Sequence, residues 1–357
     1  MKKLSQILLL TLVVVTLVSA FVFSANAIDI SSAAQLAKLM AGTDTTNYPL
    51  DGDYVLRNNI NMSGQTQSPI GDNDTPFRGT FNGGGYAISN INITAGQYTG
   101  LFGVTANATI KNLTVSGTVK STIATDESAR TGGLVGMSRG DLTLTGVTTK
   151  IDVTTKGNNV GGLIGLVDFN DTSTTNLLTI TDCANEGTIS GGKYVGGMVG
   201  ALGGSDAYSQ AGTLKITNTH NRGTVKSTGN CAAGFVGYFN FMGTSNRGDL
   251  YIAHCTNTAT ITGGDGFVGG IVGGYLASPN TYASDLTLEV VQNRGKVSGK
   301  SAVGTIMGAF RMPKSNSETL RDCLNCGLST NLPMIDSVSA TTKTSKLTLA
   351  GFYNKAG

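Results

Sequence analysis

Short runs of alternating apolar and polar residues recur along most of this chain. The clearest run is Leu214-Lys215-Ile216-Thr217, in which every second residue is apolar. This period-two alternation, with β-branched residues inside the runs and Gly or Asn at their ends, predicts β-strands buried on one face. The repeated segments show no sustained 3.6-residue period, so an all-β fold is expected.

The alternating runs return at a fixed interval. Two apolar columns, two residues apart, advance by 36 residues at each step; they are Leu142, Leu178, Leu214, Leu250 and Leu286, and Leu144, Ile180, Ile216, Ile252 and Leu288. A third apolar column, nearly as regular, consists of Val119, Val153, Ile189, Val225, Ile261 and Val297. Self-similarity at a fixed period is the signature of a repeat architecture, in which neighbouring units share one core.

A glycine-flanked apolar segment marks every unit. The seven segments end at Gly103, Gly136, Gly165, Gly200, Gly237, Gly273 and Gly308. We read each unit as three short strands, exemplified by residues 214–217, 223–226 and 234–237. Stacked units of this kind predict a single right-handed parallel β-helix of about seven rungs, roughly 30 Å long at the usual strand spacing. A β-propeller is the alternative, although its blades have four strands.

Asparagine and cysteine also occupy fixed positions in the repeat. The asparagines Asn185, Asn221, Asn257, Asn293 and Asn325 each precede the turn into the second strand. They predict a structural ladder of stacked side chains, with an Asn-lined ligand groove as the alternative. Cys183, Cys255 and Cys323 share one register, expected to face inward, and alternate rungs would hold them too far apart for disulfides. We interpret Cys323 and Cys326 as an accidental pair rather than a redox or metal motif.

The ends of the chain differ from the repeats. Residues 1–27 combine Lys2 and Lys3, an apolar stretch over 7–23 and an Ala-Asn-Ala site, which predicts a cleaved signal peptide; an uncleaved anchor is the alternative. Residues 28–75 are expected to form an N-terminal cap and entry strands, with a capping helix over 32–40. The repeats extend over 76–327, and residues 328–357 are predicted as a C-terminal cap or tail.

Composition narrows the class of protein. The chain has 357 residues, 50 of them Gly, only 6 Pro, 39% hydrophobic residues and a formal net charge of +3. Few prolines and no Gly-X-Y period exclude collagen, and the hydrophobic content argues against disorder. The sequence has no cluster of Lys and Arg residues of the kind that binds nucleic acid.

The glycine segments carry a family resemblance. With the pattern G-[GA]-[LMFI]-[VI]-G, they resemble the GLUG motif of secreted and surface bacterial proteins, including adhesin-like proteins and a region ahead of the catalytic part of IgA-specific metalloendopeptidases. The entry segments 54–62, 68–71 and 77–85 also look like the start of such β-helices. The resemblance implies a parallel β-helix at the cell surface with a role in adhesion.

The sequence offers no catalytic constellation. His220 and His254 are 34 residues apart, unlike the paired histidines of zinc proteases. Asp182 and Asp322 share a register but lie four rungs apart, and Glu186 beside Arg222 predicts a surface ion pair. The segments 51–53 and 72–74 could bind calcium, but turns are the preferred interpretation. We therefore assign no catalytic, metal or cofactor-binding residue and expect no enzyme activity, with a β-helix polysaccharide lyase or glycoside hydrolase as the alternative.

A binding role is the leading functional hypothesis. An exported, adhesin-like monomer would bind a glycan or a host or matrix protein, and would be secreted or associated with the cell surface. A structural spacer is the second alternative, and exposed Thr columns raise ice binding as a further one. The ligand-binding residues stay unidentified, but contacts are expected in the loops 121–131, 168–176, 203–212, 240–248 and 277–284. Aromatic residues near them could stack on a sugar, with ordinary packing under a loop as the alternative; they are Tyr208, Tyr238, Phe239, Phe241 and Tyr275.

Overall fold

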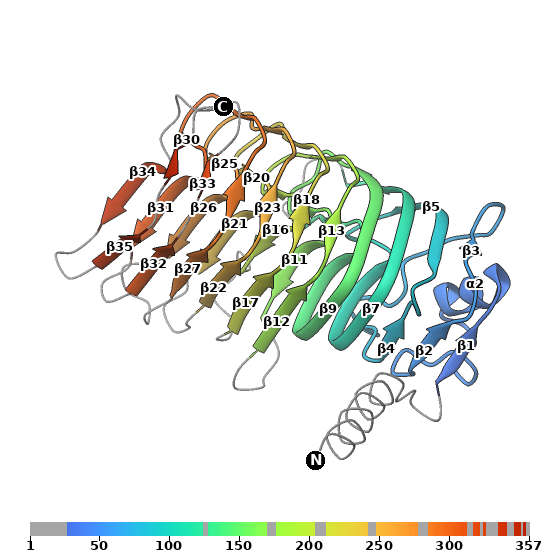
Figure 1. Ribbon diagram of the computed structural model, residues 1–357. Helices are drawn as coiled ribbons and strands as arrows, with labels where there is room; N and C mark the ends of the chain where they lie inside the picture. Colours follow the sequence, from blue (N-terminus) through green and yellow to red (C-terminus); the bar gives the residue numbers. More distant parts are fainter. Residues whose placement is uncertain are drawn as a thin grey trace, which may run out of the picture.

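The protein is a parallel β-solenoid, seen in a computed structural model (Figure 1). The structure describes residues 27–357 except 124–127, 170–175, 204–211, 242–247, 278–284, 313–316, 322–323, 326–334, 341–345, 351–352 and 355–357. Strands from successive repeats lie side by side in register, and every pairing between described strands is parallel. This confirms the predicted all-β solenoid and excludes the propeller, whose blades are separate sheets around an axis.

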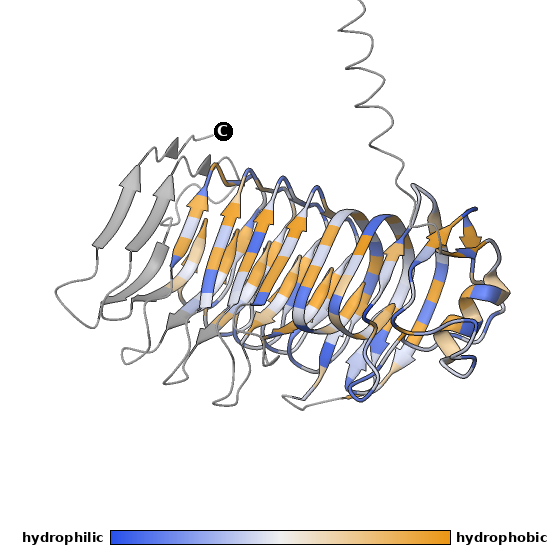
Figure 2. Cartoon of the chain, turned by 90° about the horizontal axis from the view of Figure 1, so that it is seen from below, coloured by the Kyte–Doolittle hydropathy of each residue, from blue (hydrophilic) through white to orange (hydrophobic). Residues whose placement is uncertain are grey.

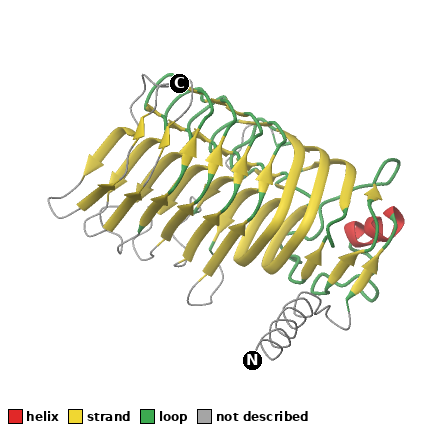
Figure 3. Cartoon of the chain, viewed as in Figure 1, coloured by secondary structure: helices red, strands yellow, loops and turns green. Residues whose placement is uncertain are grey.

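The N-terminal part contains a helix and the first rungs. It consists of β1 (Ile28–Ile30), α2 (Ala33–Ala41), β2 (Tyr54–Leu56), β3 (Ile60–Asn61), β4 (Thr80–Asn82) and β5 (Ala87–Ala95). Helix α2 begins after Ser32, whose side chain accepts a hydrogen bond from the Gln35 amide, and ends at Gly42 with φ of 64°. Leu36, Leu39 and Met40 are buried, so the predicted capping helix is confirmed, and it covers the end of the stack (Figure 3).

Two groups of strands form the turns. A seven-stranded sheet contains β6 (Tyr98–Thr99), β8 (Arg130–Gly132), β10 (Val160–Gly161), β15 (Val195–Gly196), β20 (Ala232–Ala233), β25 (Val268–Gly269) and β30 (Val303–Gly304). The larger sheet contains two long, bent strands, β7 (Phe102–Ser121) and β9 (Val135–Thr154).

In later turns, the path that β7 and β9 follow as single long strands is divided among four shorter strands. They are β11 (Ile164–Asp168), β12 (Asn176–Thr181), β13 (Ala184–Asn185), β14 (Ile189–Gly191), β16 (Val199–Leu202), β17 (Gly212–Thr217), β18 (His220–Asn221), β19 (Val225–Ser227), β21 (Val236–Phe241), β22 (Gly248–Ala253), β23 (Thr256–Asn257), β24 (Ile261–Thr262), β26 (Val272–Ala277), β27 (Leu286–Glu289), β28 (Gln292–Asn293) and β29 (Val297–Ser298).

The last strands continue the same ladder. They are β31 (Met307–Met312), β32 (Ser317–Arg321), β33 (Leu324–Asn325), β34 (Ile335–Ala340), β35 (Lys346–Ala350) and β36 (Tyr353–Asn354). Strands β34, β35 and β36 pair with β31, β32 and β33. Parallel pairing therefore extends into the segment expected to be a C-terminal cap or tail.

Two details of the predicted repeat need correction. The glycine segment is a corner between two strands rather than a strand, since residues 234–235 separate β20 from β21. The solenoid has about five turns, fewer than the seven predicted from the glycine segments. A short strand of the smaller sheet ends at, or directly before, the first residue of each of the seven segments, so the glycine corners outnumber the turns.

Glycine is required at these corners because the chain passes directly against the neighbouring turn. A Cβ atom added at Gly237 would lie 2.6 Å from the Gly200 carbonyl oxygen and 2.8 Å from the Val195 backbone. A Cβ at Gly197 would lie 2.2 Å from the Gly234 carbonyl oxygen. Both distances are below van der Waals contact with backbone atoms, so any side chain would force the turns apart.

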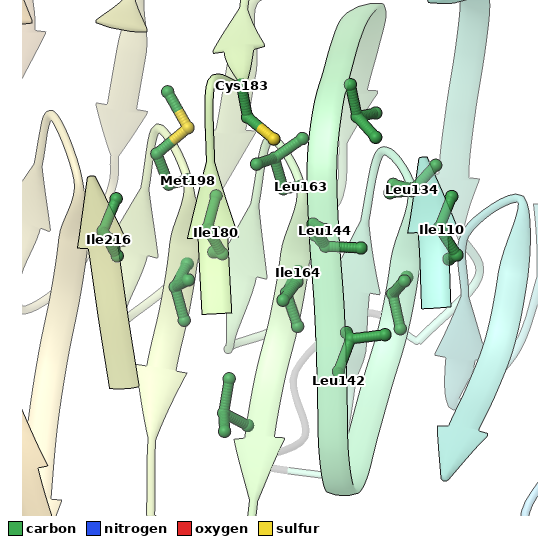
Figure 4. Close-up of a cluster of buried hydrophobic side chains, with 14 of the residues drawn as sticks. Ile110, Leu134, Leu142, Leu144, Leu163, Ile164, Ile180, Cys183, Met198 and Ile216 are labelled. Atoms are coloured by element: carbon green, nitrogen blue, oxygen red, sulfur yellow. The ribbon is translucent and has the colours of Figure 1, made fainter. Parts of the chain in front are cut away.

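The interior is one continuous hydrophobic core. Figure 2 shows the alternation of hydrophobic and hydrophilic residues along the strands, and Figure 4 shows the stacked interior columns, including Ile110, Leu144, Ile180 and Ile216. The leucines of the 36-residue repeat pair directly, as Leu214 does with Leu250, and are at most 1% exposed. Burying one such side chain contributes about 2 kcal/mol. Cys183 and Cys255 belong to this core as predicted, and both are free thiols.

The asparagine ladder is buried as well. The Nδ2 atoms of Asn185, Asn221 and Asn257 donate to the Oδ1 atom of the asparagine in the next turn, at 2.9, 2.9 and 2.8 Å. Each of these side chains is 0% exposed. The structural ladder is thus confirmed from Asn185 to Asn293, and the alternative of an open Asn-lined groove is wrong because these amides face the interior.

Candidate functional site

The outer face of β17, β22 and β27 carries a compact set of polar and aromatic side chains. Alternation places Leu214, Leu250 and Leu286 inside, and directs the residues on either side of them outward. Two outward columns result, one of Thr213, Asp249 and Asp285 and the other of Lys215, Tyr251 and Thr287. The three strands thus bring side chains 36 residues apart onto one surface.

A shallow groove lies between these columns. Its volume is about 280 Å³, and its lining consists of Thr213, Lys215, Asp249, Leu250, Tyr251, Asp285 and Thr287. Binding sites for small ligands are concave and combine an apolar surface with a few convergent polar groups. The groove has both, since it presents an aromatic ring beside two carboxylates, one ammonium and two hydroxyls.

Tyr251 is held in place by both neighbouring turns. Its hydroxyl donates to Glu289 Oε2 at 3.2 Å, and Lys215 Nζ lies 5.5 Å from the ring centroid. Partial burial, together with the adjacent Glu289 carboxylate, raises the pKa of Tyr251 above its ordinary value. The phenol is therefore neutral at physiological pH and keeps its donor function.

The acidic residue at the start of the strand also connects neighbouring turns. Asp249 Oδ1 accepts a hydrogen bond of 2.8 Å from the Asp285 amide. Asp141 Oδ1 accepts one of 2.7 Å from the Leu177 amide in the same way. A carboxylate at this position therefore fixes the backbone at the matching position in the next turn, and the same bond orients Asp249 at the groove.

The aromatic residues expected to contact a sugar have different locations. Phe239 and Tyr275 are 0% exposed and stack inside the solenoid, with ring centroids 4.4 Å apart. Tyr238 faces outward but stacks on Tyr194 at 4.4 Å. The expectation of a sugar platform is therefore wrong for the first two residues, because β21 and β26 direct them inward. Tyr208 and the Phe241 side chain lie outside the described part.

Backbone geometry explains the acidic column that we considered for catalysis. Asp182 has φ of 54°, and Asn218, His254 and Val290 in the next turns have φ of 51°, 55° and 51°. The left-handed conformation favours Asn, Asp and Gly, so the carboxylate at Asp182 is explained by a turn. Asp322 lies outside the described residues. Glu186 forms the predicted exposed ion pair with Arg222 at 3.3 Å and a second one with Lys150 at 2.9 Å.

The two calcium candidates are also turns. Asp72 Oδ1 accepts hydrogen bonds from the Thr75 and Asp74 amides, at 2.7 and 3.0 Å, and the Thr75 amide bond is the main cause of its lowered pKa. Asp53 Oδ1 accepts from the Thr80 amide at 3.1 Å. Within the described residues, no group of three or more His, Cys, Asp or Glu could hold a metal ion.

The remaining predicted features lie on other parts of the chain. His220 and His254 occur in different registers, and burial is the main cause of a lowered pKa at His220. Cys323 and Cys326 lie outside the described residues, as do the centres of the five predicted contact loops. Sequence reasoning missed Tyr251. The sequence does distinguish Tyr251, because this aromatic residue occupies a repeat position that other turns fill with Thr143, Thr179, Lys215 and Thr287.

Comparisons with known proteins support the fold more strongly than any activity. No family model matches the chain. It is similar to the crystal structure of "a putative immunoglobulin A1 protease" from Bacteroides ovatus, with a TM-score of 0.53 and 18% identity over 84% of this chain and 85% of that one. Similarity at this identity shows a shared β-solenoid fold and transfers no catalytic residue.

Two curated proteins share parts of the sequence. One is the "Putative Gly-rich membrane protein" of Evansella cellulosilytica, 40% identical over 74 residues, which are 20% of this chain and 9% of that protein. The other is the halomucin of Haloquadratum walsbyi, 28% identical over 242 residues, or 56% of this chain and 2% of that protein. The matches span less than a tenth of either relative. No helix among the described residues is long and apolar enough to cross a membrane.

Proposed function

We propose that this chain is an exported, non-enzymatic protein of the cell surface that binds an extracellular glycan or a matrix protein. The observation that carries the proposal is the groove on β17, β22 and β27. The solenoid requires the inward leucines of these strands, whereas nothing in its core requires Tyr251 and Lys215 together on the outside.

Several features support a surface location. The first 27 residues have the order of a signal peptide, and we interpret the glycine segments as GLUG motifs of surface proteins. The names of the two sequence relatives refer to a membrane protein and a mucin. A stiff stack with one continuous core would hold outward side chains at fixed spacing, which suits recognition of an extended ligand.

Localisation and binding can be tested together. Intact cells producing the chain should lose it on brief external protease treatment, while a cytoplasmic marker survives. The purified chain should bind saturably to immobilised glycans or matrix proteins without releasing oligosaccharide. Release of oligosaccharide would establish the alternative of a β-helix lyase or hydrolase, and failure to bind any surface would leave a structural spacer.

A further inference from the structure

We propose that the groove at Tyr251 binds a neutral sugar unit of a glycan, with the sugar ring lying against the tyrosine ring. This inference rests on the proposed function and names its ligand class. Carbohydrates present C–H groups on the face of each ring and hydroxyls around the rim. A complementary protein surface therefore has an aromatic face with donors and acceptors around it.

The dimensions of the groove suit such a ligand. Adjacent strands in a sheet lie about 4.8 Å apart, and residues two positions apart along a strand are separated by about 6.6 Å. The six outward side chains therefore form a grid three strands wide and two positions deep. With a volume of about 280 Å³, the groove can hold one or two sugar units but no folded partner.

The aromatic ring is fixed before any ligand arrives. The hydrogen bond of 3.2 Å to Glu289 and the Lys215 ammonium at 5.5 Å constrain Tyr251 from opposite neighbouring strands. Ordering a flexible aromatic side chain on binding would cost conformational entropy. Because the turns already orient this ring, less of that cost falls on the binding step.

The polar rim supplies both kinds of hydrogen-bonding group. Asp249 and Asp285 provide acceptors, Lys215 provides donors, and the Thr213 and Thr287 hydroxyls provide both. Sugar hydroxyls also donate and accept, so they can pair with every member of this set. Hydrogen bonds to charged groups are stronger than those between neutral groups.

The charge of the groove indicates which glycans are disfavoured. Among the described residues at the groove, three carboxylates, those of Asp249, Asp285 and the adjacent Glu289, lie near one ammonium group, that of Lys215. Like charges brought together across an interface oppose binding. Sulfated or uronate-rich polymers should therefore bind poorly, and neutral hexose chains should bind better.

The experiment uses the purified full-length chain in titration calorimetry. The probes are cellohexaose, laminarihexaose and mannohexaose as neutral glycans, and heparin and polygalacturonate as polyanions. Tyr251→Ala removes the ring, Tyr251→Phe keeps the ring without the hydroxyl, and Tyr86→Ala is the matched control. Tyr86 is 38% exposed and lies outside the groove. Circular dichroism and the unfolding midpoint check that each variant is folded.

We expect at least one neutral oligosaccharide to bind, Tyr251→Ala to weaken it about tenfold, and Tyr251→Phe and Tyr86→Ala to change it less than threefold. Binding to polyanions alone, or neutral-glycan binding unaffected by Tyr251→Ala, would overturn this inference and leave the proposed function intact. Binding to a matrix protein without any glycan would do the same. Absence of binding to every glycan and matrix protein would overturn both.

Discussion

Replacing Asn221 by Ala tests whether the buried ladder stabilises the stack. The Asn221 side chain accepts a hydrogen bond from Asn185 Nδ2 and donates one to Asn257 Oδ1, both 2.9 Å long. Alanine removes both bonds. The two neighbours keep one partner each, because Asn185 Nδ2 also donates to the Gly187 carbonyl and Asn257 Oδ1 also accepts from the Ala259 amide.

The expected loss follows from these contacts. Each buried hydrogen bond contributes about 1 kcal/mol net, and leaving buried groups partly unpaired adds a comparable amount. Removing the amide from a 0% exposed position also leaves a small cavity. We therefore expect Asn221→Ala to lower the free energy of unfolding by about 3 kcal/mol in total.

Urea unfolding followed by circular dichroism measures this loss, and hydrogen exchange locates it. Protection should fall most in β18 and its neighbours β13 and β23, since each turn contacts only adjacent turns. Asn230→Ala, at an exposed position, is the control and should change stability by less than about 0.5 kcal/mol. A loss below about 1 kcal/mol for Asn221→Ala would refute the reasoning, because unpaired buried amides cost more than that.

The Asn221→Asp variant adds a pH dependence. A carboxylate cannot donate to Asn257 Oδ1, and burial raises its pKa above the unfolded value of about 3.9. The ionised carboxylate therefore destabilises the folded protein fully at pH values above its pKa in the folded state. This loss of stability disappears as the pH falls below the pKa of the same group in the unfolded state. The stability gap between Asn221→Asp and Asn221→Ala should therefore narrow from pH 7 to pH 4, and a constant gap would contradict it.

Three further outcomes are expected. Val290→Asn should raise stability by about 1 kcal/mol in urea unfolding, because a β-branched residue at φ of 51° is strained where Asn is tolerated; a loss would contradict this. Cys255, 0% exposed and with a pKa raised to about 12 by burial, should resist iodoacetamide at pH 8 until urea is added, as mapped by mass spectrometry. Glu186→Gln should cost less than about 1 kcal/mol in the same urea assay, because its ion pairs with Lys150 and Arg222 are exposed; a larger loss would indicate a buried network.

The repeat could be read from the sequence with little error. Leu214 and Leu250 are partners in the structure as their 36-residue spacing predicts, because a parallel stack in register is the arrangement that buries identical columns together. The inward position of Cys183 and Cys255 followed from the same register. Local signals also located the capping helix, since Ser32 at its start and the apolar face with Leu36 act within a few residues.

The sequence did not predict which side chains face inward in the strand that follows a glycine corner. Phe239 and Tyr238 are adjacent, yet one lies in the core and the other stacks outside. Which of them faces inward depends on where β21 begins after the glycine corner, whereas the sequence pattern predicts a strand over the whole glycine segment. A shift of one residue exchanges the two faces of a strand, so an error at the corner misassigned the aromatic side chains.

The sequence by itself thus determined the period, the core columns and the asparagine ladder, because each depends on short-range alternation repeated in register. Only the tertiary structure decided which outward residues meet. Thr213, Asp249 and Asp285 are 36 residues apart along the chain, and Tyr251 is fixed by Glu289 and Lys215 from the two adjacent turns. These contacts cross between turns, so they exist only once the solenoid has set the distance and direction of every strand.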